Sequence, residues 1–173
     1  MRLYLVGYMG CGKSTLGRKL ARALQCDFVD TDSMVEQAQG ATIADIITYE
    51  GEERFREYER EALEQTAQYD NAIISTGGGL PIWGDNMERI HALGPSIYIR
   101  RSAEQIASRL SPHGRQKRPK LRGLSDEELV EFMSRNMAER EPVYVKADVT
   151  LEAANRSDWE LIEEIANYLT TQR

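Results

Sequence analysis

The chain has 173 residues, of which 41% are hydrophobic and 29% are charged, and its formal net charge is −6. This length and composition indicate a single globular domain, and no run approaches the ~20 apolar residues that cross a bilayer. The acidic balance argues against nucleic-acid binding, two cysteines are too few for a disulfide framework, and the first residues lack a secretory cleavage site, so we expect a cytoplasmic protein without nucleic-acid or membrane partners. We also expect it to be a monomer.

Five short apolar runs predict buried strands with helices between them. The predicted strands are residues 3–7, 27–30, 72–76, 96–99 and 148–151. Helices are predicted from residue 14, from 42, over 52–68, 86–93 and 103–110, from 125 to about 139, and from 157, and Thr42, Ser125 and Ser157 are the expected helix caps. This alternation predicts an α/β fold with a parallel sheet covered on both faces, and such sheets bind ligands at the carboxyl ends of their strands.

The segment GYMGCGKST follows the first predicted strand. Gly7, Gly12, Lys13 and Ser14 fit the pattern G-x-x-x-x-G-K-[ST] between a strand and a helix. The glycines let backbone N–H groups point at phosphate oxygens, and the helix N-terminus adds partial positive charge. The alternative, a chance match in a glycine-containing turn, arises in roughly one chain in two hundred. We therefore expect nucleoside triphosphate binding by the residues Gly10, Cys11, Gly12, Lys13, Ser14 and Thr15.

Two aspartates, Asp30 and Asp32, follow the second predicted strand. One can hold a water bound to Mg²⁺, and the other can accept a proton from an attacking hydroxyl group. The alternative is that either residue only caps the next helix, which aspartate does well. Next to a phosphate-binding loop, the functional interpretation is favoured.

A second glycine loop, STGGGLP, follows the third predicted strand, and residues 77–79 permit close backbone approach by an acceptor substrate. Its alternative is a plain turn. Arg56 and Glu59 share one face of a predicted helix, which also suits a solvated salt-bridge surface. Arg140 lies near the expected end of another helix, where the helix dipole alone would favour it.

The run HGRQKRPKLRG, residues 113–123, carries five basic and no acidic residues. It could contact nucleic acid, form a solvated loop, or close over ATP as a lid. We favour the lid, because an arginine delivered by a closing loop stabilises a transferred phosphoryl group and closure excludes water. Its prolines and glycines predict no regular helix over the lid, about residues 111–124. Arg100 and Arg101 either lie near phosphates or are simply exposed.

The motifs GYMGCGKST, DTD, GEERFREYE, STGGGLP, the RP of the lid and REPVY occur in this order over essentially the whole chain. Together they resemble the shikimate kinase family of P-loop kinases related to nucleoside monophosphate kinases. The resemblance implies a three-layer fold with strand order 2-3-1-4-5 and ATP-dependent phosphorylation of the 3-hydroxyl of shikimate, in aromatic amino-acid biosynthesis. The alternatives are a gluconate or nucleotide kinase, or a catalytically silent nucleotide-binding module.

The resemblance also implies residue roles at the acceptor end of the site. The catalytic residues would be Lys13, the base Asp32, and Arg118, with ATP and Mg²⁺ as cofactors. The Mg²⁺ ligands would be Ser14 and Asp30, the latter through water. Shikimate would contact Asp32, Arg56, Gly77, Gly78, Gly79 and Arg140, with Glu59 supporting Arg56 and with a substrate-binding segment of about residues 31–60.

At the nucleotide end, the resemblance implies that Arg109 stacks on adenine and that Arg118 reaches the ATP phosphates. Arg156, next to Asn155, is assigned to the adenine loop, although that loop lacks a proline found in many relatives. Lys120 replaces a leucine common in the family, so the lid contacts with substrate are expected to differ. The remaining basic residues of the lid are expected to be mostly solvated, namely Arg115, Lys117 and Arg122.

Overall fold

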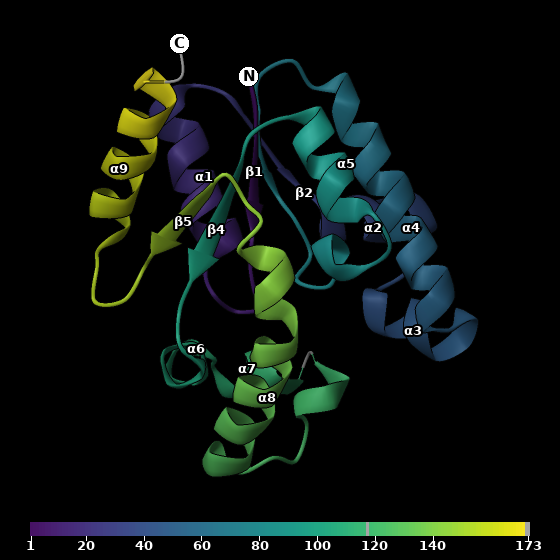
Figure 1. The fold of residues 1–173 in the computed structure, drawn as a ribbon. Coiled ribbons are helices and arrows are strands. Elements are labelled where there is room, and N and C mark those ends of the chain that lie inside the picture. Colours follow the sequence, from purple (N-terminus) through teal and green to yellow (C-terminus); the bar gives the residue numbers. More distant parts are fainter. Residues whose placement is uncertain (117, 172–173) are drawn as a thin grey trace.

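In a computed structural model of the protein, residues 1–116 and 118–171 are described, and Lys117 lies outside them. The described residues form a five-stranded parallel sheet in the order β2-β3-β1-β4-β5, which confirms the expected topology. Figure 1 shows the strands side by side with helices in front and behind. The strands are β1 (Arg2–Val6), β2 (Asp27–Asp30), β3 (Ala72–Ser75), β4 (Ser96–Arg100) and β5 (Val149–Glu152).

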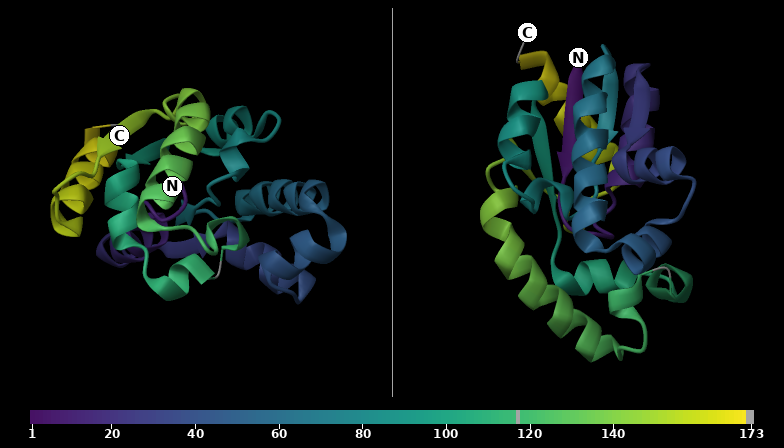
Figure 2. Two further views of the ribbon diagram at one scale, coloured as in Figure 1. Left: turned by 90° about the horizontal axis from the view of Figure 1, so that it is seen from below. Right: turned by 90° about the vertical axis from the view of Figure 1, so that its right-hand side faces the viewer.

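Helices connect the strands and cover the sheet, as the two views of Figure 2 show. The longer helices are α1 (Lys13–Leu24), α2 (Thr31–Gln39), α3 (Ile43–Glu50), α4 (Glu52–Gln65), α5 (Asn86–Leu93), α6 (Ala103–Arg109), α8 (Asp126–Tyr144) and α9 (Asp158–Thr171). Short turns of helix are η1 (Thr66–Gln68), η2 (Leu80–Ile82), α7 (Pro112–Gln116) and η3 (Pro119–Leu121). In Figure 1, α6, α7 and the lower part of α8 lie beyond the carboxyl ends of β4 and β5.

The central strand β1 is buried on both faces, since Leu3, Tyr4, Leu5 and Val6 have no exposed surface. It pairs in parallel with β3 on one side and β4 on the other. A strand covered on both faces has a continuous apolar sequence rather than an alternating one, as LYLV shows. The main core therefore fixes β1, and with it the start of the loop that follows.

A second, smaller apolar cluster joins α2, α3 and α4. Its buried members are Val35, Ile46, Phe55, Tyr58 and Ala62. This cluster joins the three helices to one another, while Leu63 of α4 belongs to the main core and attaches them to the sheet. Figure 1 shows these helices on the right, with α3 at the lower end.

Three local expectations are wrong. Helix α8 continues to Tyr144 rather than ending near residue 139, although Pro142 lies inside it. A proline this close to the C-terminus removes only one hydrogen bond of the last turns. Helix α2 follows β2 directly and was not predicted. The lid contains a helical turn, α7, which begins at Pro112, and proline suits the first position of a helix because its missing N–H would be unpaired there.

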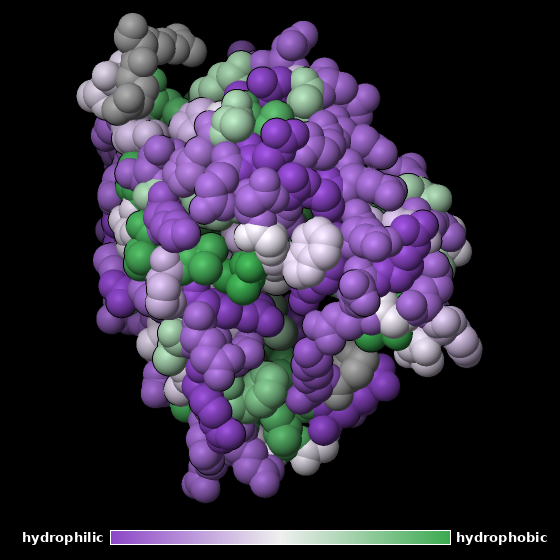
Figure 3. All heavy atoms as spheres, turned by 45° about the vertical axis from the view of Figure 1, so that its right-hand side comes forward, coloured by the Kyte–Doolittle hydropathy of each residue, from purple (hydrophilic) through white to green (hydrophobic). Residues whose placement is uncertain are grey.

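The helix caps agree with the sequence. Ser125 and Glu128 form a reciprocal capping box at α8, and Ser157 and Glu160 exchange the same two hydrogen bonds before α9. The surface shown in Figure 3 is mostly hydrophilic, with hydrophobic residues in separated patches. None of the helices in the described part of the chain is both long and apolar enough to span a membrane.

Candidate functional site

The loop between β1 and α1 has the backbone of a phosphate-binding loop. Gly7, Gly10 and Gly12 all have positive φ, and Gly12 is the N-cap of α1 with φ 102°. A Cβ at Gly10 would lie 3.1 Å from a methyl group of Ile106, so larger residues are excluded by space as well as by conformation. The first N–H groups of α1 have no partners within the helix, and they form an anion site at the sheet edge.

The ammonium group of Lys13 lies inside this loop. Its side chain is 6% exposed, and Nζ donates hydrogen bonds to the carbonyl oxygens of Gly7 at 2.7 Å and Tyr8 at 2.9 Å. Carbonyl oxygens are neutral acceptors, and a charged phosphate oxygen forms a stronger hydrogen bond with an ammonium group. The loop thus holds a desolvated cation for which an anion is the better partner.

Asp30 has two functions at once. Its Oδ1 accepts the N–H groups of Asp32 at 3.1 Å and Ser33 at 3.3 Å, which caps α2, while Oδ2 accepts the hydroxyl of Ser14 at 2.6 Å. Ser75 Oγ lies 3.2 Å from Ser14 Oγ. These hydroxyl and carboxylate oxygens are ligands of the kind that Mg²⁺ prefers. The described residues contain no cluster of three or more His, Cys, Asp or Glu ligands.

The carboxylates of Asp32 and Glu59 lie close together against the same face of Gly77. A Cβ built on Gly77 would be 2.5 Å from Asp32 Oδ1 and 2.8 Å from Glu59 Oε1. Burial, and then the charge of Asp30, raise the pKa of Asp32 to about 6, although Lys13 opposes this. Burial is also the first cause that raises the pKa of Glu59 to about 7, against the opposing charge of Arg56. Two weakened acids therefore face each other beside the P-loop.

Two arginines from different helices converge on Glu59. Arg56, one turn earlier on α4, forms an ion pair with it, and Glu59 is 1% exposed. The charge of Arg140, from α8, also lowers the pKa of Glu59. Arg140 lies with its guanidinium 5.5 Å from the ring centroid of Tyr8. Arg56 also lies 3.4 Å from Glu52, and the planar guanidinium groups of Arg56 and Arg140 are suited to a carboxylate ligand.

The second glycine loop is fixed from several sides. Tyr144 donates a hydrogen bond to the carbonyl oxygen of Gly78 at 2.6 Å, and the N–H of Gly77 donates to Thr31 Oγ1 at 3.0 Å. A Cβ on Gly78 would lie 3.0 Å from the backbone nitrogen of Met9 in the P-loop, and one on Gly79 would lie 2.6 Å from Arg56 Nη2. The three glycines thus touch the acids, the P-loop and the arginine in turn.

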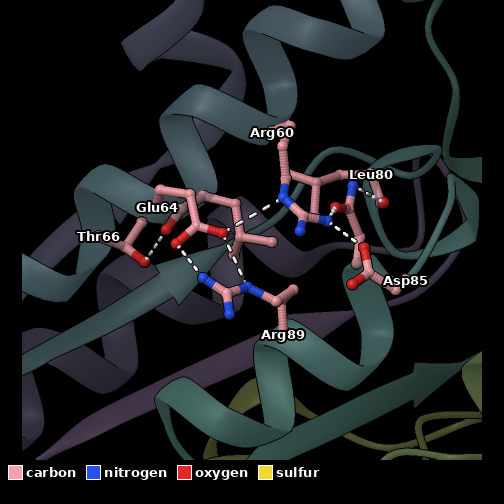
Figure 4. A network of polar contacts seen from close by, with 8 residues as sticks. Arg60, Glu64, Thr66, Leu80, Asp85 and Arg89 are labelled. Carbon is pink, nitrogen blue, oxygen red and sulfur yellow. Dashed lines mark hydrogen bonds and ion pairs between the residues drawn. The ribbon is translucent and has the colours of Figure 1, made fainter.

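A polar network holds α4 against α5 and the end of the glycine loop (Figure 4). Arg89 donates two hydrogen bonds to Glu64, at 2.8 and 2.6 Å, and Arg60 contacts Asp85 at 2.5 Å. Arg60 also donates to Asn86, whose amide donates to the carbonyl oxygen of Leu80 at 2.8 Å. This network fixes the helix that carries Arg56 relative to the loop that faces it.

The lid lies over the site and is anchored by Leu121, which is 1% exposed. Arg118 donates a hydrogen bond to the carbonyl oxygen of Gly114 at 2.6 Å, and burial lowers its pKa while the charge of Asp32 acts in the opposite direction. Arg118 is therefore close enough to Asp32 for their charges to interact. Arg115 pairs with Asp126 at 2.6 Å rather than being only solvated.

Two further basic residues of the lid have partners, namely Arg122, which was expected to be mostly solvated, and Lys120, whose contacts were left open. Arg122 donates to the carbonyl oxygen of Gln116 at 2.7 Å. Lys120 lies 3.6 Å from Glu52 Oε1 on α4, and the same oxygen is 3.4 Å from Arg56 Nη2. The lysine thus links the lid to α4, the helix that carries Arg56.

The residues assigned to the nucleotide base are separated. Arg109 lies over the P-loop, since its Nη2 would be 3.3 Å from a Cβ on Gly12. Arg156 points to α9, where it pairs with Glu164 at 2.6 Å and donates to the carbonyl oxygen of Glu152 at 3.3 Å. Asn155 has a left-handed backbone with φ 54°. The structure brings Arg109 to the phosphate loop and holds Arg156 against the last helix.

Sequence reasoning missed the positions of several residues around the site. Arg100 is exposed and pairs with Glu141 and Glu152, whereas Arg101 is 8% exposed and donates to the carbonyl oxygens of Cys11 and Ala153. Its location directly after β4, at the carboxyl edge, was the available signal. The hydrogen bond from Tyr144 to the glycine loop joins segments 66 residues apart, and no local pattern reveals it.

Comparisons with known proteins agree on one family. A family model described as shikimate kinase matches residues 9–170. A shikimate kinase from Parabacteroides distasonis is 39% identical over 168 residues, which cover 97% of this chain and 96% of the relative. A crystal structure of shikimate kinase from Bacteroides thetaiotaomicron superposes with a TM-score of 0.91 at 34% identity, covering 98% of each chain. A shikimate kinase from Acinetobacter baumannii, solved in complex with shikimate, gives a TM-score of 0.88 at 30% identity over 99% of this chain and 94% of that one.

Proposed function

The chain belongs to the shikimate kinase family, and from that premise we propose how its residues divide the work of transferring a phosphoryl group from ATP to shikimate. The enzyme phosphorylates shikimate with ATP. The observation that carries the residue assignment is the ion pair of Arg56 with the buried Glu59 beside a P-loop, with Arg140 near enough for its charge to act on the same carboxylate. That corner suits a small hydroxylated carboxylate better than a second nucleotide.

At the acceptor end, Arg56 and Arg140 bind the carboxylate of shikimate, and Glu59 orients Arg56 through their ion pair. The N–H groups and the narrow backbone of Gly77, Gly78 and Gly79 form the wall against which the ring packs. Asp32 accepts the proton of the 3-hydroxyl as that oxygen attacks the γ-phosphorus. Its pKa of about 6 leaves it ionised at neutral pH and makes it a stronger base than an ordinary aspartate.

At the donor end, the N–H groups of residues 10–15 and the ammonium group of Lys13 bind the phosphate chain of ATP. The bonds from Lys13 to Gly7 and Tyr8 are exchanged for bonds to phosphate oxygens. Arg118 stabilises charge on the transferred group, and the lid of about residues 111–124 excludes water. Arg109 contacts the adenine, and Arg156 borders the adenine loop from the α9 side.

Ser14 and Asp30 are the residues that would hold Mg²⁺, Ser14 directly and Asp30 through water. Held there, Mg²⁺ would supply positive charge that offsets the negative charge developing on the phosphoryl group during transfer. The substrate-binding segment of about residues 31–60 corresponds to the helices joined by the second apolar cluster. We also propose that the protein acts as a cytoplasmic monomer without nucleic-acid or membrane partners. Light scattering of the purified protein tests whether it is a monomer.

A coupled assay of ADP release tests the acceptor directly. Shikimate, gluconate and nucleoside monophosphates are compared at equal concentration with a control that contains no acceptor. We expect ADP release above the control only with shikimate. Turnover with gluconate or a nucleotide but not with shikimate would reject the proposed acceptor site, and ATP binding without transfer to any acceptor would favour a silent module.

A further inference from the structure

Arg101 is a buried cation without a carboxylate partner. It is 8% exposed, it forms no ion pair within the described residues, and burial lowers its pKa by more than the charge of Asp158 raises it. Its neighbour Arg100 is exposed and pairs with Glu141 at 2.9 Å and with Glu152 at 3.0 Å. Burying a charge without a counter-ion is costly, so a buried unpaired arginine needs a reason beyond packing.

The hydrogen bonds of Arg101 lead to the two segments assigned to ATP. Nε donates to the carbonyl oxygen of Cys11 at 3.0 Å, in the P-loop, and Nη1 donates to that of Ala153 at 2.6 Å, where β5 leads into the adenine loop. Ala153 is itself fully buried, and its N–H donates to the carbonyl oxygen of Arg100 at 3.0 Å. One side chain therefore sets the spacing of the P-loop and the adenine loop.

The bond to Cys11 also acts on the electrostatics of the P-loop. The carbonyl group of Cys11 belongs to the same peptide unit as the N–H of Gly12, the N-cap of α1. Donation by a charged guanidinium polarises that peptide and makes its N–H a stronger donor, because hydrogen bonds in a chain strengthen one another. The positive charge of Arg101 stands behind the loop, on the carbonyl side of this peptide.

A second cation is close by. The charge of Arg109, after burial itself, is a cause that lowers the pKa of Arg101. Arg109 also lies over Gly12, so the loop has one guanidinium behind it and one beside it. Two cations that repel each other around a ring of N–H donors are stabilised together when a polyanion enters that ring.

We propose that Arg101 is a positioning residue for the nucleotide, which raises the affinity of the P-loop for the triphosphate chain through its bonds to Cys11 and Ala153. The proposal rests on the P-loop being the ATP site of the proposed function. Arg101 touches neither the reacting atoms nor shikimate, and it acts through the peptide between Cys11 and Gly12.

The test compares Arg101→Met, Arg101→Lys and the matched control Arg100→Met in the full-length protein. Dissociation constants are measured by calorimetry for inorganic tripolyphosphate, ATP and shikimate, with the melting temperature of each variant. We expect Arg101→Met to weaken tripolyphosphate and ATP binding by about tenfold to a hundredfold, with the shikimate constant within about twofold. Arg101→Lys, which keeps the charge with fewer donors, should recover part of this loss, and Arg100→Met should bind all three ligands as the unmodified enzyme does.

The proposal would be overturned if Arg101→Met binds tripolyphosphate and ATP as tightly as the unmodified enzyme does. It would also be overturned if the affinities for tripolyphosphate, ATP and shikimate all fall by the same factor, because Arg101 would then have a structural role only. If Arg101→Met does not fold, Arg101→Lys decides: an unchanged tripolyphosphate constant overturns the proposal, and a selective loss supports it. The tripolyphosphate titration contains no shikimate. It therefore decides the role of Arg101 even if the ADP-release assay were to identify another acceptor.

Discussion

The substitution Gly79→Ala should weaken shikimate binding while leaving ATP binding and the stability of the fold unchanged. Gly79 has φ −87° and ψ −18°, a backbone that alanine adopts without strain. The added Cβ would lie 2.6 Å from Arg56 Nη2 and 2.7 Å from its Cζ. Ordinary contact is roughly 3.5 Å, so the guanidinium must move by about 1 Å. It is the end of a flexible side chain, so the fold can accommodate the methyl group while the carboxylate site cannot.

The size of the effect follows from what Arg56 contributes. A hydrogen bond to a charged group is worth about 1.5–3 kcal/mol, which corresponds to roughly 10- to 150-fold in affinity. We expect the shikimate KM to rise about 10- to 100-fold, with the ATP KM within about twofold. Replacing glycine by alanine at a compatible backbone stabilises a protein by about 0.4–1 kcal/mol, so the melting temperature should not fall. Steady-state kinetics with each substrate varied in turn and calorimetric melting measure all three quantities.

Two comparisons make this reasoning refutable. In an Arg56→Ala background the Gly79→Ala change should have little further effect, because the group that it displaces is already absent. Gly78→Ala serves as a contrasting variant. Its Cβ would lie 3.0 Å from the backbone nitrogen of Met9 in the P-loop, so we expect this change to weaken ATP binding rather than shikimate binding. A Gly79→Ala enzyme with an unchanged shikimate KM, or with ATP and shikimate affected equally, would show that Arg56 is not held where the structure places it.

Three further predictions concern the lid and the acids. Arg118→Ala should lower kcat by at least about a hundredfold while the shikimate KM changes little; an unchanged kcat in single-turnover and steady-state assays would exclude a role in transfer. Burial raises the pKa of Asp32 to about 6 and that of Glu59 to about 7, above the values in the unfolded chain. Between the unfolded and the folded pKa values, the folded protein therefore binds more protons than the unfolded chain does. The free energy of unfolding without ligands should therefore fall as the pH rises from about 4 to about 7, and Asp32→Asn should flatten that slope in urea denaturation, whereas stability that increases over this interval would contradict the burial of the two acids. Lys120→Leu removes an exposed ion pair with Glu52 and should change the free energy of unfolding by less than about 1 kcal/mol, so a larger loss in denaturation would mean that the pair carries more than a surface contact.

The fold was predictable because its strongest signals are local. The apolar run LYLV, the glycine pattern after it and the capping pairs at Ser125 and Ser157 each depend on residues within a few positions. Helix α2 escaped prediction because it has few apolar residues, and it is stabilised by the cap from Asp30 and by packing against α4. Helix α8 extends past residue 139 to Tyr144, which is buried and contacts the glycine loop. A local rule that ends helices at proline does not take such a tertiary contact into account.

The candidate site divides in the same way. The P-loop and Asp30 could be found from spacing, because both follow a strand at the carboxyl edge of the sheet. Sequence could not tell whether Asp30 caps a helix or faces Ser14, and the structure shows that its two oxygens do both. The burial of Arg101 and the pairing of Arg100 with Glu141 were equally open, because adjacent residues after a strand point to opposite sides. Only tertiary structure decides which of them faces the core.

The acids at the acceptor end show why burial and catalysis are linked here. The carboxylates of Asp32 and Glu59 lie together on the Cβ side of Gly77, where a glycine leaves room for both and a side chain would displace them. Burial weakens both acids, but Lys13 and Arg56 limit the rise for Asp32, so it stops at a pKa of about 6. An exposed aspartate with a pKa of about 4 would be a poorer proton acceptor, and one raised above 7 would be protonated in neutral solution. Lys13 and Arg56, which we propose to bind phosphate and carboxylate, therefore also keep the pKa of the proposed base in the range where it is both ionised and effective.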